Sequence, residues 1–134
     1  DMVFGADLIA GFPTEGEAQF GNTLSLIDDC GLTFLHVFPY SARAGTPAAR
    51  MPQVPGPERR RRAALLRRRG EAALADFLTS RVGRRARVLV ERAGQGRCEQ
   101  FAVTDIAADI AVGAIVDVEI AAATSDRLIG RIAA

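Results

Sequence analysis

The sequence predicts an α/β fold that ends in a small antiparallel β-barrel. Residues 7–38 read as a strand, a helix and a second strand, residues 58–80 show a helical spacing of apolar side chains, and residues 86–132 alternate between apolar and polar side chains. The first pattern favours a βαβ unit with parallel strands and a right-handed crossover. The last pattern favours four or five short strands that close into a barrel.

The βαβ unit begins with an apolar strand, DLIAGF, over residues 7–12. Thr14 is the expected N-cap of the helix that follows, because Glu17 stands three residues later at the capping-box position. Gly31 is the expected end of that helix. The second strand, LTFLHVF, covers residues 32–38.

A long helix is expected between the βαβ unit and the barrel. It follows a loop with five prolines over residues 39–57 and runs from Glu58 to about Ser80. One face of the helix is apolar, and most of its arginines lie opposite. Gly70 lies in the apolar stripe and weakens the helix by roughly 1 kcal/mol relative to alanine.

The barrel is expected from short alternating segments after Gly83. Residues 93–96, AGQG, form a hairpin turn signal. The expected strand segments are residues 86–91, 101–103, 114–120 and 127–132. The chain therefore divides into a βαβ part over 1–56, a connecting helix over 57–82 and a barrel over 83–134.

Positive charge is concentrated in the middle of the chain, although the net charge is only +1. Residues 57–97 hold 13 arginines and four acidic residues, and no basic residue of the chain is a lysine. This pattern indicates either contact with an anionic partner such as nucleic acid or a solvated helix face in an arginine-rich protein. On the barrel, the candidate RNA-binding residues are Arg84, Arg85, Arg87, Arg92 and Arg97.

Several classes of protein are disfavoured by the sequence. No apolar run approaches the length of a membrane-spanning helix, so no membrane partner is expected. Cys30 and Cys98 are far apart and build no local metal motif, and two scattered thiols suit a reducing cytoplasm. His36 stands alone in an apolar strand, so a histidine packed in the core is expected rather than a base or a ligand.

The candidate binding residues follow the two strands of the βαβ unit, where α/β proteins place their ligands. Gly11 would let a ligand approach the backbone, and Phe12 and Pro13 would wall that position. After the second strand, Tyr40, Ser41 and Arg43 could bind a carboxylate or phosphate, or could cap the strand end.

Taken together, these segments resemble the C-terminal part of the radical-SAM methylthiotransferases. DLIAGFPTE over residues 7–15 is similar to that family's motif DxIxGFPxE. LHVFPYSARAGTPAARMPQVP over residues 35–55 is similar to HVFPYSxRxGTPAARMxxQVP, and the barrel resembles a TRAM domain, an RNA-binding module. The residues of the second motif are closest to those of the family branch that methylthiolates C2 of N6-threonylcarbamoyladenosine at tRNA position 37.

The resemblance implies a fold and a set of cofactors. The βαβ unit corresponds to the late βα units of a partial (β/α) radical-SAM barrel. Residues that would line the S-adenosylmethionine pocket are Gly11, Phe12, Pro13, Phe38, Tyr40 and Ser41. Two [4Fe–4S] clusters are also implied, and because this chain lacks their cysteine motifs, their ligands are expected outside it and the chain alone is expected to be inactive. The implied partner is a tRNA anticodon stem-loop.

Some residues depart from the family's pattern. Thr14 stands where many members have glycine, and Gly16 stands where many have threonine. Ala42 and Ala44 replace prolines. The alternative functions are a methylthiotransferase of the isopentenyladenosine or ribosomal-protein branch, or a stand-alone RNA-binding module. The open strand edges of an isolated βαβ unit also predict a homodimer.

Overall fold

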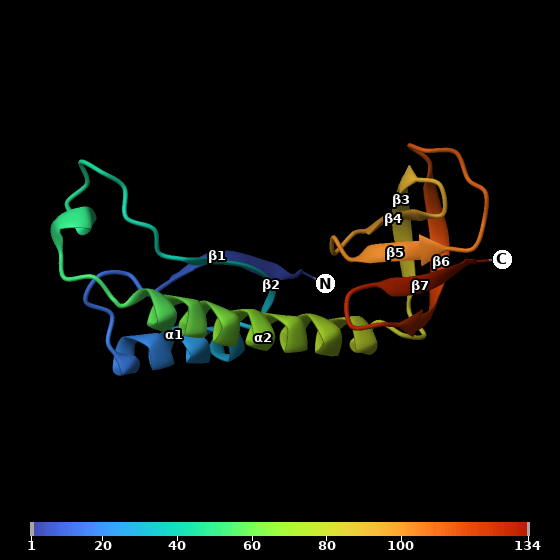
Figure 1. Cartoon of the computed structure of the whole chain (residues 1–134). Coiled ribbons are helices and arrows are strands. Elements are labelled where there is room, and N and C mark those ends of the chain that lie inside the picture. Colours follow the sequence, from blue (N-terminus) through green and yellow to red (C-terminus); the bar gives the residue numbers. More distant parts are fainter. Residues whose placement is uncertain (1, 134) are drawn as a thin grey trace. The chain divides into compact units, whose positions relative to one another are not determined.

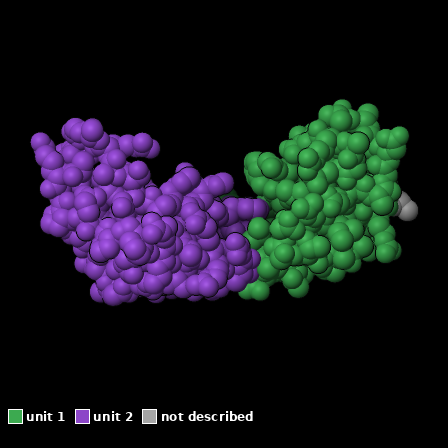
Figure 2. Space-filling view, in the orientation of Figure 1, with its two compact units in different colours: residues 1–2, 74–134 green, residues 3–73 purple. Residues whose placement is uncertain are grey.

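The computed structural model describes residues 2–133, which form two compact units (Figure 1, Figure 2). The first unit in chain order covers residues 3–73 and is purple in Figure 2, where the key calls it unit 2. The second covers residues 74–133 together with Met2 and is green, unit 1 of the key. The helices and strands are β1 (Phe4–Ala10), α1 (Glu17–Asp29), β2 (Leu32–Pro39), the 3-10 turn η1 (Ala48–Arg50), α2 (Gly56–Ser80), β3 (Arg85–Arg92), β4 (Gln95–Cys98), β5 (Val103–Ile106), β6 (Ile115–Ala123) and β7 (Leu128–Ile132). The prediction of an α/β chain that ends in a small barrel is confirmed, and of the four or five strands expected for the barrel the structure has five.

The first unit is a two-stranded parallel sheet with both helices on one of its faces (Figure 1). β1 and β2 pair in register from Gly5 with Phe34 to Ala10 with Pro39. Alternate residues of the strands pack against the helices because successive side chains point to opposite faces. The buried apolar residues of this core are Ala10, Phe20, Ile27, Leu32, Val37, Ala63 and Leu66.

The opposite face of this sheet is bare within the described residues. Ile9 and Phe38 are neighbours in the register and are 55% and 54% exposed. Asp7 and His36 are the next pair on the same face, and both are exposed. The prediction of a packed histidine is therefore wrong for this chain, because His36 alternates with Leu35 and Val37, which face the helices.

The segment between β1 and α1 is a tight turn that the sequence pattern did not reveal. Thr14 is not the N-cap of α1, because its backbone is left-handed with φ +70° and the helix starts at Glu17 with Gly16 as N-cap. Gln19 closes half of a capping box, since its side-chain oxygen accepts the Gly16 N–H at 3.0 Å. Thr14 thus occupies a conformation that suits glycine, and Gly16 occupies a cap that suits threonine.

Exchanging the side chains at these two positions is expected to stabilise the first unit. Thr14→Gly should raise the free energy of unfolding by about 1 kcal/mol, because a left-handed backbone costs a β-branched residue more than glycine loses in entropy. Adding Gly16→Thr should contribute a few tenths of a kcal/mol more through an N-cap hydroxyl. Urea unfolding followed by the fluorescence of Tyr40, the single tyrosine of a chain without tryptophan, measures both changes. Thr14→Ala is the control and should give less, because it keeps the strained Cβ; equal gains from both substitutions at position 14 would contradict the argument.

Helix α2 contributes its first part to the first unit and its last residues to the second. Gly70, expected only to weaken the helix, has a packing role. A Cβ at this position would lie 2.8 Å from Leu35 Cδ1 of β2 and 3.2 Å from Leu35 Cβ, so the glycine lets the strand approach the helix closely. The cost in helix propensity is therefore offset by contact between α2 and β2.

The second unit is a closed barrel with the strand order β3-β4-β5-β7-β6. Among the described residues, the buried apolar residues of its core are Leu78, Ala86, Val88, Val90, Cys98, Ala102, Ile106, Val118, Ile120 and Leu128. The expectation of a purely antiparallel barrel is wrong for one pair, since β5 and β7 run parallel. β7 turns back along β6 and closes the barrel against β5, which gives it the same direction as β5.

Candidate functional site

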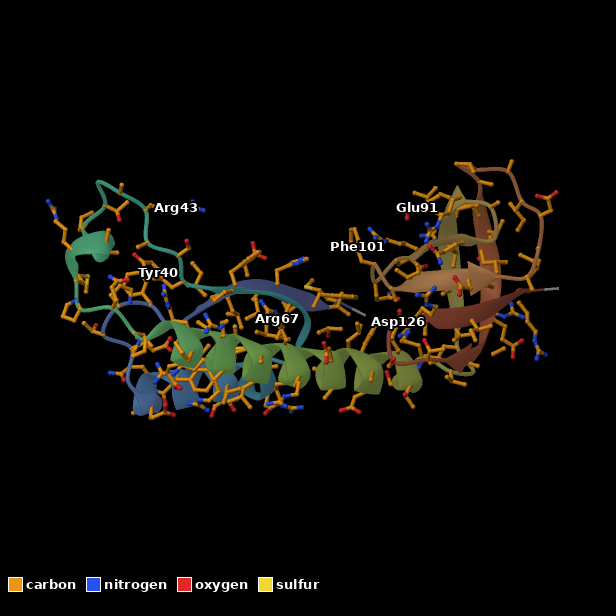
Figure 3. The ribbon with its side chains drawn as sticks, viewed as in Figure 1. Tyr40, Arg43, Arg67, Glu91, Phe101 and Asp126 are labelled. Carbon is orange, nitrogen blue, oxygen red and sulfur yellow. The ribbon has the colours of Figure 1, made fainter. Side chains whose placement is uncertain are left out.

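The ends of β1 and β2 meet at one edge of the first unit. The Tyr40 N–H donates to the Ala10 carbonyl at 2.8 Å, so the parallel ladder continues to the last residue of β1. The rings of Phe12 and Tyr40 then meet edge to face, with centroids 5.3 Å apart and planes at 74°. The two loops predicted to bind a ligand are thus brought together, with Tyr40 at the exit of β2 (Figure 3).

A cavity of about 310 Å³ lies beside the exit of β2 and the start of α2. Its lining residues are Pro39, Tyr40, Ser41, Gly56, Arg59 and Arg60. The Tyr40 hydroxyl oxygen is buried and has no hydrogen-bond partner among the described residues. A buried hydroxyl without a partner is costly, so the group suits a ligand atom that completes it. The lining residues Ser41, Arg59 and Arg60 also carry hydrogen-bond donors, of the kind that bind a carboxylate or another anion.

Two features of the structure favour glycine at position 11, namely its backbone conformation and the nearby Arg59 side chain. Its φ is +75°, in the left-handed region. A Cβ at this position would overlap Arg59 Cγ and lie 3.0 Å from Arg59 Cβ. The space beside the glycine is therefore filled by an arginine side chain, whereas the sequence pattern suggested that it was left for a ligand. Of the neighbouring residues, Phe12 is 45% exposed and Pro13 is fully buried.

Most arginines of α2 bind groups within the first unit. Arg59 Nη1 donates to the Tyr40 carbonyl at 2.8 Å, and Arg67 Nη2 donates to the Val37 carbonyl at 2.9 Å. Arg61 pairs with Glu58 and Glu17, and Arg69 pairs with Asp28 of α1. The basic stretch of the helix, read from sequence as a nucleic-acid surface or a solvated face, thus mainly fixes α2 to α1 and β2.

Arg62 is the most enclosed of these arginines, with a side chain only 5% exposed. It donates to Glu15 Oε1 and to the Glu15 carbonyl, both at 2.8 Å, to Glu17 Oε1 at 2.9 Å and to Glu58 Oε1 at 2.8 Å. Burial lowers the pKa of Arg62, but the hydrogen bonds to these acids outweigh burial and raise it. The Arg61 guanidinium lowers the pKa of Glu58 to about 2, so Glu58 is ionised at neutral pH.

Sequence spacing did not reveal Arg59, Arg60 and Arg62 as site residues. Their signal in the sequence is a charge run followed by a helix, which is typical of a solvated face. The roles of Arg59 and Arg62 depend on contacts with residues 19 and 47 positions earlier in the chain.

The arginines predicted to bind RNA follow β3 and β4 of the second unit. Arg85, Arg87 and Arg97 lie on the exposed side of these strands. Arg87 Nε lies 3.3 Å from Glu99 Oε1, and Arg97 Nε lies 3.8 Å from Glu91 Oε2. The two remaining candidates are Arg92, whose Nε donates to Gln95 at 2.8 Å, and Arg84, whose N–H donates to the Arg81 carbonyl at 3.1 Å.

A shallow hollow of about 170 Å³ lies on the same side of the barrel, lined by Arg87, Leu89, Arg97, Cys98, Glu99 and Ile115. Phe101 lies in the turn between β4 and β5 and is 70% exposed with φ +62° (Figure 3). Exposed apolar and aromatic side chains among arginines are features of surfaces that bind single-stranded nucleic acid. The sequence pattern did not indicate Phe101 as a residue of the RNA surface, because the exposure of a single aromatic residue cannot be read from the sequence.

Residues 2–133 hold no group of three or more histidine, cysteine, aspartate or glutamate side chains that could bind a metal ion. Cys30 is exposed in the first unit, and Cys98 is buried in the core of the barrel. These residues do not fit an iron–sulfur cluster. None of the described helices is long and apolar enough to span a membrane.

Comparisons with known proteins show which enzymes the chain resembles. No family model matches the chain. It is 44% identical to a threonylcarbamoyladenosine tRNA methylthiotransferase of Rickettsia prowazekii over 120 residues, which are 90% of this chain and 28% of that protein. It is 38% and 37% identical to the tRNA-2-methylthio-N(6)-dimethylallyladenosine synthases of Alcanivorax borkumensis and Erythrobacter litoralis, over 97% and 98% of this chain and 32% and 31% of those proteins.

The chain thus spans about 30% of the length of these curated relatives. The relatives are enzymes of two related types, and both types match nearly the whole chain. The resemblance to the radical-SAM methylthiotransferases is therefore confirmed, because nearly the whole chain is similar to a part of tRNA methylthiotransferases of two types.

Proposed function

We propose that this chain is the part of a tRNA methylthiotransferase that helps to hold S-adenosylmethionine at the strand exits and tRNA on the barrel. The observation that carries the proposal is the convergence of the β1 and β2 exits on a cationic cavity, in a chain whose relatives are tRNA methylthiotransferases. The paired strands are proposed to be late strands of a partial radical-SAM barrel, whose remaining strands would cover the bare face that carries Ile9 and Phe38.

The residues at the strand exits fit S-adenosylmethionine. Arg59 and Arg60 offer donors to a carboxylate, and the Tyr40 hydroxyl lacks a partner. The exposed ring of Phe12 beside Tyr40 gives an aromatic surface for a purine. When bound, S-adenosylmethionine and two [4Fe–4S] clusters would supply the radical and sulfur chemistry. The described residues would hold and orient the first of these groups and provide no ligand set for the clusters.

Threonylcarbamoyladenosine at tRNA position 37 is the proposed substrate, with methylthiolation at C2. The support is the higher identity to the relative that acts on this nucleoside, 44% against 38% and 37% for the two dimethylallyladenosine synthases. The isopentenyladenosine branch is the second candidate, because its members match up to 98% of the chain.

The proposal predicts which tRNA the full-length protein carrying this chain modifies. After reconstitution with iron and sulfide, and with S-adenosylmethionine and a reductant, it should methylthiolate tRNA bearing threonylcarbamoyladenosine at least about tenfold faster than tRNA bearing isopentenyladenosine. Mass spectrometry of nucleoside digests measures both products. Preference for isopentenyladenosine would select the second branch, and modification of a ribosomal protein alone would refute a tRNA enzyme. The 134-residue chain by itself should show neither cluster absorbance nor product.

The same assay tests the proposed RNA surface. Arg84→Ala/Arg85→Ala should raise the tRNA concentration needed for half-maximal rate and flatten its salt dependence, because fewer phosphates are neutralised. Arg50→Ala/Arg68→Ala, at two exposed positions of the first unit, is the charge-matched control for loss of two arginines. An unchanged salt dependence in the double variant would remove these arginines from the RNA surface. Binding of tRNA by the chain without any methylthiolation by the full-length protein would favour a stand-alone RNA-binding module.

We also propose that the isolated chain forms a homodimer through β1. The Tyr40 N–H points toward β1, so the Val37 carbonyl, three residues earlier, points to the outer edge of β2. Arg67 occupies that carbonyl, which leaves the outer edge of β1 as the better edge for pairing. Light scattering that finds only monomer across the micromolar range would refute this.

A further inference from the structure

The turn between β1 and α1 is held from inside by one carboxylate. Glu15 Oε1 accepts the Gly11 N–H at 3.0 Å and a hydrogen bond from Arg62 Nη1 at 2.8 Å. The same Arg62 nitrogen donates to the Glu15 carbonyl at 2.8 Å. A continuous series of polar contacts therefore links the second turn of α2 to the backbone of Gly11.

Arg62 is built to hold this carboxylate in one orientation. Its Nη2 and Nε donate to Glu17 and Glu58, at 2.9 and 2.8 Å, so every nitrogen of the guanidinium group has an acceptor. The ring of Phe20 lies below it, 5.4 Å from the guanidinium carbon. Side chains of Arg62 and Glu15 are 5% and 11% exposed, so water competes little for these contacts.

The turn that is fixed in this way carries Phe12. Gly11 and Thr14 flank that residue with φ values of +75° and +70°, so the turn depends on two uncommon backbone conformations. Phe12 directs its ring to Tyr40, which lines the cavity. Arg62 does not line the cavity itself, so its effect on a ligand there passes through Glu15 and the turn.

We infer that Arg62 is a positioning residue for the ligand held at the strand exits, acting through Glu15 on the backbone of Gly11 and on the ring of Phe12. The inference rests on the proposed binding of S-adenosylmethionine at this site. It gives a buried arginine of the basic helix a role in the ligand site of the first unit. At metal sites, replacing the partners that orient the ligating residues typically lowers affinity about 10- to 100-fold, and we expect an effect at the lower end of this range here.

The test uses the full-length protein with Arg62→Lys, which keeps the charge but cannot bridge several acceptors at once. The first readout is deuterium exchange of the peptide that contains Gly11, and the second is the dissociation constant of S-adenosylmethionine by calorimetry. Exchange should rise about tenfold and affinity should fall about tenfold, while kcat at saturating S-adenosylmethionine stays within about threefold. Glu15→Gln keeps Arg62 and should give the same pattern more weakly, which keeps the test valid if Arg62→Lys does not fold.

Arg61→Lys is the matched control. Arg61 also binds Glu17 and Glu58 but makes no contact with Glu15, and its side chain is 48% exposed. In this variant, deuterium exchange at Gly11 and the affinity for S-adenosylmethionine should both stay within about twofold of the values for the protein without substitutions. Faster deuterium exchange at Gly11 in Arg62→Lys with unchanged affinity for S-adenosylmethionine would overturn the inference and leave Arg62 a purely structural role. Unchanged exchange would show that Arg62 does not act on Gly11 through Glu15. If the full-length protein without substitutions binds no S-adenosylmethionine, the proposed function fails. Deuterium exchange at Gly11 still decides whether Arg62 fixes the turn.

Discussion

Replacing Gly96 with alanine is expected to cost the barrel about 3 kcal/mol or more of its free energy of unfolding. Gly96 lies in β4 opposite Val90, next to an irregularity in the register of β3 and β4. A Cβ there would overlap the Leu89 carbonyl oxygen and lie 2.7 Å from the Leu89 carbonyl carbon and 2.8 Å from Val88 Cγ1. Because two of these atoms belong to the backbone of a paired strand, no change of rotamer relieves the overlap.

Gly130→Ala is the matched control, since Gly130 lies in strand β7 of the same barrel. The three atoms nearest to its Cβ would all belong to side chains, Val118 Cβ and Cγ2 at 3.2 Å and Thr104 Cγ2 at 3.3 Å. These can shift by a few tenths of an ångström, so a cost of about 1 kcal/mol is expected. Tyr40 lies in the other unit, so deuterium exchange of β3 and β4 is the appropriate measure of barrel stability. Equal costs for the two substitutions would show that the approach of β4 to β3 is looser than described.

The order and type of the elements could be read from the sequence because they depend on local periodicity. Alternation of apolar residues located β3 and β6, and helical spacing located α2 to within two residues of its start. The parallel pairing of β5 with β7 could not be read in this way. It depends on how the barrel closes, and the pattern within each strand is the same for both directions of pairing.

The part of the candidate site that could be predicted from the sequence comes from a single loop after a strand. Tyr40 and Ser41, two of the residues that the motif at the end of β2 implied for a ligand, follow a strand and line the cavity, and their role in binding S-adenosylmethionine stays a prediction. Arg59 and Arg60, which complete the cavity, come from a helix whose composition resembles a solvated surface. Thr14 and His36 were misread for a related reason, because a left-handed turn and a bare sheet face are properties of the folded backbone and not of residue type.

Arg62→Met is expected to destabilise the first unit by about 3–5 kcal/mol, because it leaves a buried carboxylate without its partner. Glu15, 11% exposed, would keep only the Gly11 N–H, while Glu17 and Glu58 still have Arg61. Urea unfolding followed by Tyr40 fluorescence reports this unit directly, since Tyr40 is the single tyrosine and lies within residues 3–73. A loss of this size is a large fraction of the 5–15 kcal/mol that typically stabilises a domain.

The double variant Arg62→Met/Glu15→Met separates the cost of an unpaired charge from the net worth of the pair. If the loss comes mainly from the isolated carboxylate, the second substitution should recover about 1–3 kcal/mol, since two apolar side chains of similar volume can replace a buried ion pair at little cost. Recovery should remain incomplete, because the Gly11 N–H then lacks its acceptor at 3.0 Å and the turn keeps its two left-handed residues. A double variant less stable than Arg62→Met would contradict this. It would mean that the hydrogen bond from the Gly11 N–H to Glu15 stabilises the turn by more than the unpaired Glu15 carboxylate destabilises it. In that case the carboxylate, and not the arginine, would be the group on which the strand-exit site depends.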